Sequence, residues 1–265
     1  MKTIVVCGGN SGIGLEAARQ LTALGHRVVL LGRDDRKGAS ALAELKRNPG
    51  TSAFLAVDLS THAGVRSAAA QVLAAHEQFD VLLHTSGVLT FEDVRTTDGL
   101  HPFFAVNFLS RYHLTQLLLP TLRRSASARV IMLTSDVPLD TTIDFDQFPM
   151  FSPFTFQPMT APIQIGNHHY AAHLRDTEPH ILAAVVNAGV ADTGIWRATP
   201  QSFRPRVMNS IPQSAINPVA LCLNDDWPSG SYWATLGHPE QATPLRLDPT
   251  ATARVIATCR DLTGT

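Results

Sequence analysis

Short runs of hydrophobic residues alternate along the chain with longer segments in which hydrophobic residues recur every three or four positions. The short runs have the length of buried β-strands, and the longer segments have the period of amphipathic helices. The predicted strands are residues 3–7, 27–32, 53–59, 80–87, 128–135 and 180–189, and the predicted helices are residues 15–24, 36–46, 62–76 and 106–122. Strands that alternate with helices form right-handed βαβ units, which place helices on both faces of a parallel sheet. The pattern therefore predicts an α/β fold, a Rossmann-type doubly wound parallel sheet, with residues 1–265 as a single domain.

The alternation stops over residues 136–164, where the chain contains five prolines and five phenylalanines. Irregular segments of this length are uncommon in compact domains, and those that occur often form lids or walls of a binding site. The aromatic content favours an ordered wall on the substrate side over disorder. A second irregular region, residues 195–217, follows a predicted core strand, and we expect it to cover the same cleft.

The composition is that of a well-buried globular protein, since 45% of the 265 residues are hydrophobic and 16% are charged. A net charge of −1 offers no field for nucleic acid or a membrane surface. No apolar run reaches the roughly 18 residues of a membrane-spanning helix, and the first residues lead directly into a strand pattern. Cys7, Cys222 and Cys259 are too scattered for a disulfide framework or a cysteine-based zinc site. We therefore expect a cytoplasmic protein without nucleic-acid or membrane partners.

The first predicted strand leads into a glycine-rich turn, CGGNSGIG, at the start of the first predicted helix. Gly8 permits a tight turn, Gly12 lets the backbone approach a diphosphate, and Gly14 allows close packing. The amides at the helix N-terminus supply hydrogen-bond donors and a positive potential. We therefore expect a dinucleotide in contact with Gly8, Asn10, Ser11, Gly12, Ile13 and Gly14.

The spacing of these glycines, Gly-x-x-x-Gly-x-Gly, resembles that of the short-chain dehydrogenases/reductases, in which a threonine is common where Cys7 stands. Further stretches that resemble this family follow in order along nearly the whole chain. The VDL and TSG tripeptides and the stretch VNAGVADTGI resemble its cofactor-contacting segments, with Ala188 in place of a proline. The resemblance implies that the following residues contact the cofactor: Asp58, Leu59, Ser86, Gly87, Val190 and Thr193. The sequence IDFDQF resembles the retinol-dehydrogenase-like branch of the family.

The resemblance also implies roles for a serine and an asparagine. Ser135 ends the predicted strand VIMLTS at the position of the family's catalytic serine. A hydroxyl at the carboxyl end of a central strand points into the crevice where ligands bind, so Ser135 would hydrogen-bond a substrate oxygen. Asn107, within VNFLSRYHLTQLLLPTL, matches the family's structural and catalytic asparagine, which also supports the sheet.

The end of the second predicted strand, LLGRDDRKG, indicates which coenzyme is bound. Arg33 stands where the family's phosphate-binding arginine stands, with Arg36 and Lys37 close behind. A guanidinium pairs with the ribose 2′-phosphate of NADP(H), whereas an acidic residue there accepts hydrogen bonds from the free 2′-hydroxyl of NAD(H). The alternative is a solvated charge cluster with Asp34 and Asp35. We expect NADP(H).

The family's proton-transfer pair, a tyrosine and a lysine four residues later, is not intact in the segment IGNHHYAAHLRD. In one alignment Tyr170 is the tyrosine and Leu174 replaces the lysine. A tyrosine titrates near 10, so Tyr170 would stay protonated and could donate a proton during carbonyl reduction. In a second alignment, which accounts for more residues, Ile165 replaces the tyrosine and His169 the lysine. His168 and His169 would then border the cleft, where either replaces the lost acid or base or merely hydrogen-bonds at a helix start.

A metal site has little support, because no glutamate-containing zinc motif accompanies His169 and His173. The sequence thus predicts an atypical short-chain dehydrogenase/reductase that uses NADP(H) to reduce a carbonyl group of a hydrophobic small molecule. Ser135 would polarise the oxygen, and Tyr170 or a histidine would supply the proton.

Two alternative functions stay open. The chain could be a non-redox enzyme of the same fold, such as a cyclase, isomerase or lyase in secondary metabolism, or a nucleotide-binding protein without turnover. The family commonly forms dimers or tetramers through two long helices. A homo-oligomer stays open here, because the second of these helices, expected from about His168 to Asp176, is short for the family.

Overall fold

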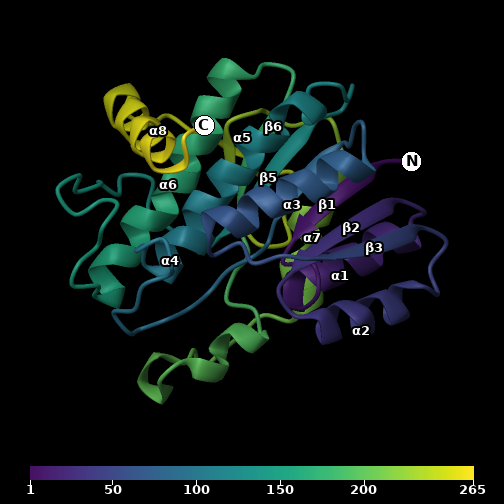
Figure 1. The fold of residues 1–265 in the computed structure, drawn as a ribbon, viewed down its shortest axis with the longest axis horizontal. Helices are drawn as coiled ribbons and strands as arrows, with labels where there is room; N and C mark the ends of the chain where they lie inside the picture. Colours follow the sequence, from purple (N-terminus) through teal and green to yellow (C-terminus); the bar gives the residue numbers. More distant parts are fainter.

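A computed structural model describes residues 1–156, 158–197 and 199–265 in full, and its eight strands form one sheet (Figure 1). The strands are β1 (Thr3–Cys7), β2 (Arg27–Gly32), β3 (Thr51–Ala56), β4 (Val81–His84), β5 (Arg129–Thr134), β6 (Leu182–Asn187), β7 (Ser231–Trp233) and β8 (Thr243–Pro244). Their order is β3-β2-β1-β4-β5-β6-β7-β8, and every pair is parallel except β7 with β8. The predicted doubly wound sheet is confirmed. The order reverses between β1 and β4, so the carboxyl ends of these two strands open a crevice.

Helices cover both faces of this sheet (Figure 1). One face carries α1 (Gly12–Ala23), α2 (Asp35–Leu45) and α7 (Ile211–Leu223), and the other carries α3 (His62–Ala75), α5 (Ser110–Leu122), α6 (Phe156–Thr177) and α8 (Pro249–Thr263). Successive side chains of a strand point to opposite faces. Ile4 and Val6 of β1 therefore pack with α1, whereas Val5 and Cys7 pack with α3 and α5. Burial on both faces explains why the parallel strands are apolar throughout.

The helix α6 begins earlier than the sequence analysis predicted. The irregular segment was predicted to extend to residue 164 and a short helix to begin at about His168, but α6 runs over 22 residues from Phe156 to Thr177. Pro158 lies in its first turn, where a proline is tolerated, and Pro162 lies in its interior. Ile163 and Tyr170 are fully buried, so tertiary packing stabilises a helix that its proline content disfavours.

The remaining irregular segment, residues 135–155, is an ordered wall. Phe148, Phe151 and Phe154 are buried in the core cluster on the α5 and α6 face. The rings of Phe148 and Phe151 pack against Phe104, which lies in the short helix α4 (Pro102–Phe104). Most of the expected apolar wall therefore packs into the core of the protein.

The second irregular region is shorter than predicted, because α7 begins within it, at Ile211. Ser210 accepts a hydrogen bond from the amide of Gln213, and the Gln213 side chain accepts one from the amide of Ser210. This reciprocal cap, which the sequence analysis did not recognise, marks the start of the helix. Two short helical turns, η2 (Gly194–Ala198) and η3 (Gln201–Phe203), lie in the part that remains.

The C-terminal helix α8 packs on α6 and α5 (Figure 1). These are the helices through which the family resemblance implied oligomers, so part of their outer surface is covered within one chain. Among the residues that the structure describes, no helix combines the length and the apolar character needed to span a bilayer.

Candidate functional site

The glycine-rich turn lies at the carboxyl end of β1, beside the point where the strand order reverses. Gly8 and Gly12 have φ values of +79° and +56°, which only glycine adopts at little cost. A Cβ on Gly8 would lie 2.8 Å from the backbone of Ser86, so the turn lies directly against the loop after β4. A glycine at position 8 is therefore required by the packing of the turn against this loop.

The first turn of α1 is open to an anion. Its N-cap residue, Ser11, makes no side-chain hydrogen bond to the helix, and the first turn contains no acidic residue. The first amides of a helix have no partner within it, and the helix dipole gives this end a positive potential. A Cβ on Gly14 would collide with Oγ1 of Thr85 and the carbonyl oxygen of Gly8, which explains the third glycine. These features fit the diphosphate of a dinucleotide.

Arg33 is exposed at the end of β2, and the carboxylate of the neighbouring Asp34 is hydrogen-bonded at the start of α2. Asp34 caps α2 by accepting a hydrogen bond from the amide of Lys37 at 3.0 Å. That bond is the main reason why the pKa of Asp34 lies below its usual range. Nδ2 of Asn10 donates to the carbonyl oxygen of Asp34 at 3.3 Å, which ties the glycine-rich turn to this loop. Arg33 is therefore an exposed cation at the end of β2, with Arg36 and Lys37 also exposed behind it.

The other expected cofactor residues lie on loops at the same edge of the sheet. The side chain of Asp58 accepts a hydrogen bond from the amide of Ser60 at 2.9 Å. Leu59 beside it is buried, whereas Val190 in the loop after β6 is partly exposed. The Thr193 methyl group lies 3.2 Å from the position of a Cβ on Gly12. The residues that the sequence analysis grouped as a cofactor site thus come from five loops, those after β1, β2, β3, β4 and β6.

Asn107 has a structural position in the helical turn η1 (Ala105–Leu109). Its Oδ1 accepts from the amide of Val88 at 2.9 Å, and its Nδ2 donates to the carbonyl oxygen of Val88 at 3.0 Å. Both ends of the side-chain amide are used, so Asn107 holds the loop that follows Ser86 and Gly87. The backbone carbonyl of Asn107 accepts from Nδ2 of Asn167 at 3.1 Å.

Ser135 is exposed immediately after β5, as expected for a residue that meets substrate. Its Oγ accepts a hydrogen bond from Nε2 of Gln164 at 3.3 Å. One turn further along α6, the ring of His168 packs against Tyr232, whose hydroxyl donates to Asp136 at 2.8 Å. Gln164 and His168 therefore share the face of α6 that points toward Ser135.

His168 lies close to this group but is fully buried. Burial lowers the pKa of His168 to about 4, so its ring is neutral at pH 7. Its Nδ1 lies 3.4 Å from the carbonyl oxygen of Gln164, and its Nε2 is buried without a hydrogen-bond partner in the described structure. Of the two histidines expected to border the cleft, only His168 faces the Ser135 side.

The alignment that makes Tyr170 a proton donor is wrong about where this side chain lies. Tyr170 is fully buried, its ring packs against Tyr112 of α5, and its hydroxyl accepts from Nε2 of Gln116 at 3.0 Å. Burial also raises its pKa well above the usual value. The reason is helical periodicity, because at ~100° per residue Tyr170 lies about 120° round the helix from Gln164 and about 160° from His168.

The expectation that His169 borders the cleft needs the same correction. Nδ1 of His169 lies 2.8 Å from Oγ1 of Thr252, so its ring faces α8. Burial lowers the pKa of His169 to about 4. Ile165, one turn before it, is fully buried. In the described part of the chain, no cluster of three or more His, Cys, Asp or Glu side chains is placed to hold a metal ion.

Arg111 is a site residue that the sequence analysis did not identify. Its guanidinium is buried at the base of the crevice, where it donates to the carbonyl oxygens of Leu133 and Ser86 and to Oδ1 of Asn167. These three groups belong to β5, the loop after β4 and α6. Burial lowers the pKa of Arg111 to about 9. The sequence signal that could have identified Arg111 is its charge on the apolar stripe of a predicted helix.

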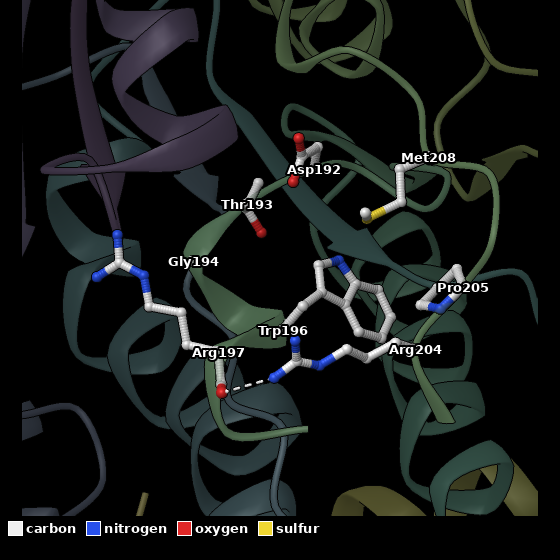
Figure 2. A pocket seen from close by; sticks show the side chains of 8 residues that line it. All are labelled: Asp192, Thr193, Gly194, Trp196, Arg197, Arg204, Pro205 and Met208. Carbon is white, nitrogen blue, oxygen red and sulfur yellow. Dashed lines mark hydrogen bonds between the residues drawn. The ribbon is translucent and has the colours of Figure 1, made fainter. Parts of the chain in front are cut away.

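A hollow of about 360 Å³ opens beside the glycine-rich turn, within the loop that follows β6. Figure 2 shows its lining, which includes Thr193, Trp196, Arg197, Arg204 and Met208. Nε and Nη2 of Arg204 donate to the carbonyl oxygens of Thr199 and Arg197 at 2.9 and 3.1 Å. Cations therefore lie next to the expected cofactor site, on a loop that the sequence analysis described only as a cover.

Comparisons with known proteins place this geometry in a family. The family model for short chain dehydrogenases matches residues 2–145. Retinol dehydrogenase 12 of Mus musculus is 40% identical over 136 residues, which is 51% of this chain and 43% of that protein. A short-chain dehydrogenase/reductase of Armillaria gallica is 32% identical over 207 residues, covering 74% of this chain and 67% of that protein. The chain thus spans less than half of the retinol dehydrogenase it matches.

Solved structures show the same fold. The Pseudomonas aeruginosa RhlG/NADP active-site complex superposes with a TM-score of 0.72 at 22% sequence identity. The match covers 91% of this chain and 96% of that one.

Proposed function

The chain belongs to the short-chain dehydrogenase family, and we propose that it is an NADP(H)-dependent reductase of a carbonyl group on a hydrophobic small molecule. The observation that carries this proposal is the open glycine-rich turn, with positive φ at Gly8 and Gly12 and an uncapped first turn of α1. The exposed Arg33 beside a capping Asp34 supports NADP(H) over NAD(H). The RhlG complex, whose title names NADP, supports the same choice.

When bound, NADPH would supply a hydride to the carbonyl carbon of the substrate. The protein's part is to hold and polarise the carbonyl oxygen. Gln164 donates to Oγ of Ser135 at 3.3 Å, so the Ser135 hydroxyl proton is left to point toward the substrate oxygen. Ser135 is exposed, so water can deliver the proton that the oxygen takes up. His168 lies on the same face of α6, but its ring is fully buried and neutral at pH 7.

A second candidate function rests on the positions of Tyr170 and His169. The first points to α5 and the second to α8, so neither meets Ser135. A fold that keeps its nucleotide site, but has neither Tyr170 nor His169 beside Ser135 to donate a proton, suits a non-redox enzyme, such as a cyclase, isomerase or lyase. It also suits a protein that holds the nucleotide without turnover.

One experiment separates these proposals. Purified protein is titrated with NADPH and with NADH by fluorescence, and NADPH absorbance is then followed with a panel of hydrophobic ketones and aldehydes. Binding of NADPH together with its oxidation supports the reductase. Binding without oxidation across the panel supports the second candidate. If neither NADPH nor NADH binds, both candidate functions are contradicted.

We also propose a reducing compartment, the cytoplasm. Cys7, Cys222 and Cys259 are buried free thiols, and burial raises the pKa of Cys7 to about 12. Titration of the three thiols in the denatured, unreduced protein checks this proposal, since three reactive groups are expected.

A further inference from the structure

The hollow beside the glycine-rich turn is built into a loop whose base is closed. The amide of Asn209 donates to the carbonyl oxygen of Val190 at 2.7 Å, and the amide of Asp192 donates to that of Asn209 at 3.0 Å. Residues 192–208 therefore form a loop whose two ends are hydrogen-bonded together. The base of this loop adjoins the expected cofactor site, because Thr193 lies against Gly12.

The loop carries a concentrated positive charge. Residues 193–210 contain three arginines and no aspartate or glutamate. Two of the arginines, Arg197 and Arg204, line the hollow. Asp192 also lines it, but no ion pair between Asp192 and either arginine occurs in the described structure. Unpaired guanidinium groups around one concavity are suited to an anionic ligand.

Arg204 is held in place before any ligand arrives. Its Nε donates to the carbonyl oxygen of Thr199. Its Nη2 donates to that of Arg197, the bond drawn as a dashed line in Figure 2. These bonds use one side of the guanidinium, and within the described residues Nη1 has no acceptor. A preorganised cation loses less side-chain entropy when it binds an anion.

The other walls of the hollow are apolar. The indole of Trp196, the ring of Pro205 and the thioether of Met208 line it. The indole is fixed, since its Nε1 donates to the carbonyl oxygen of Ala191 at 2.8 Å. Within the loop, the ring of Phe203 packs against Phe91, with centroids 4.7 Å apart. A ligand that fits these walls carries an apolar body as well as a charge.

We propose that this hollow binds a carboxylate on the carbonyl substrate, with Arg204 as the anchoring cation and Trp196 beside the apolar body. The inference rests on the proposed function and narrows its substrate class to keto or aldehyde compounds that carry a carboxylate. The glycine-rich turn and Arg33 account for the phosphates of the cofactor. The hollow adjoins that turn through Thr193, which lines the hollow and lies against Gly12.

The test compares 4-acetylbenzoate with methyl 4-acetylbenzoate, two ketones that differ in one negative charge. Binding to the cofactor-free protein and to the protein loaded with NADP⁺, which has no hydride to transfer, is followed by the fluorescence of Trp196, because Trp227 and Trp233 are buried in the core. Trp196→Phe serves as the control for the signal. We expect the acid to bind at least tenfold more tightly than the ester.

The variant Arg204→Met should weaken binding of the acid at least tenfold and leave binding of the ester unchanged. Arg204→Lys keeps the charge and should retain part of the preference for the acid. Arg206→Met is the matched control, since Arg206 is exposed on the same loop but does not line this hollow. It should change neither affinity more than about twofold.

Three outcomes overturn the proposal: equal binding of acid and ester to the unaltered protein, equal effects of Arg204→Met and Arg206→Met, or a tenfold loss of NADPH affinity in Arg204→Met with the acid preference intact. The last result would assign Arg204 to a cofactor phosphate. The comparison of acid with ester in the unaltered protein does not depend on the folding of any variant. Failure to bind NADPH would contradict the proposed function, while titration of the cofactor-free protein would still test the hollow.

Discussion

The guanidinium of Arg111 on α5 donates a hydrogen bond to Oδ1 of Asn167 on α6 at 3.2 Å, beneath the candidate site. The same guanidinium donates to the carbonyl oxygen of Ser86 at 2.9 Å and to that of Leu133. Asn167 in turn donates to the carbonyl oxygen of Asn107. One buried cation thus ties together the loop after β4, the end of β5 and the middle of α6.

Replacing Arg111 by Met should destabilise the protein by about 2 kcal/mol, because the substitution leaves buried acceptors without donors. Urea unfolding followed by circular dichroism measures the change. Arg66→Met, at an exposed position on α3, is the control and should stay within about 0.5 kcal/mol of the unaltered protein. Equal stabilities of the two variants would contradict a role for Arg111 in holding the site.

Replacing Arg33 by Ala should weaken NADPH binding by about tenfold to a hundredfold and leave NADH binding nearly unchanged. The loss corresponds to a charge-assisted hydrogen bond to the 2′-phosphate of ~1.5–3 kcal/mol. Calorimetric titration with both coenzymes gives the two affinities. A parallel loss for NADH would show that Arg33 does not select the phosphate.

Replacing Gly12 by Ala should reduce NADPH affinity at least tenfold. Its φ of +56° disfavours a Cβ, and the new methyl group would lie 3.2 Å from Thr193 on the path of the diphosphate. Gly25→Ala is the matched control, since Gly25 has a φ of +83° but no atom within 4 Å of the new Cβ. Both variants should lose about 1 kcal/mol of stability, and only the first should lose NADPH binding. Normal NADPH affinity in Gly12→Ala would place the cofactor elsewhere.

The two candidate hydroxyl groups should behave differently on substitution. Ser135→Ala should lower kcat/KM of the proposed reductase about a hundredfold, because a donor to the substrate oxygen is lost. Tyr170→Phe should leave kcat/KM within about threefold and cost about 1 kcal/mol of stability through the lost bond with Gln116. Steady-state kinetics with the best ketone of the panel gives both values. A larger loss of kcat/KM in Tyr170→Phe than in Ser135→Ala would assign the catalytic role to Tyr170.

Acid should destabilise the protein through His168. Burial lowers the pKa of His168 to about 4 from 6.5, so the unfolded chain binds the proton more tightly than the folded one. Stability is therefore complete above pH ~6.5 and falls as the pH drops toward 4, by about 2 kcal/mol for this one group between pH 7.5 and 5.

The variant His168→Phe keeps a ring against Tyr232. It should lack the part of the acid-induced loss of stability that protonation of His168 causes. Urea midpoints at pH 7.5 and 5 measure it. His180→Phe, at an exposed position, should leave the pH dependence unchanged. An unaltered pH dependence in His168→Phe would mean that His168 is not the group that titrates.

The fold and the backbone of the glycine-rich turn were largely predictable because their signals are local. The alternation of strand-length and helical segments predicted the order of the elements up to β6. The spacing of Gly8, Gly12 and Gly14 placed the turn, since positive φ and missing side chains are properties of single residues. The capping box of Ser210 and Gln213 was also a local signal, and missing it led to the error at the start of α7.

The start of α6 was not predictable in the same way. Pro158 and Pro162 argue against a helix on local grounds, and only the burial of Ile163 and Tyr170 in the core outweighs them. An error in the helix start left two alignments of residues 165–174 open. The structure excludes Tyr170 from the Ser135 side by its contact with Gln116.

By itself the sequence determined the doubly wound sheet, the position of the glycine-rich turn and the set of loops that meet at the crevice, because periodicity and backbone conformation are encoded over a few neighbouring residues. Only the tertiary structure decided which side of α6 faces Ser135. The rotation of a helix about its axis depends on partners far away in the chain, here Gln116 of α5 and Thr252 of α8. The same holds for Arg111 and Arg204, whose charges acquire their role from the carbonyl groups that the fold brings to them.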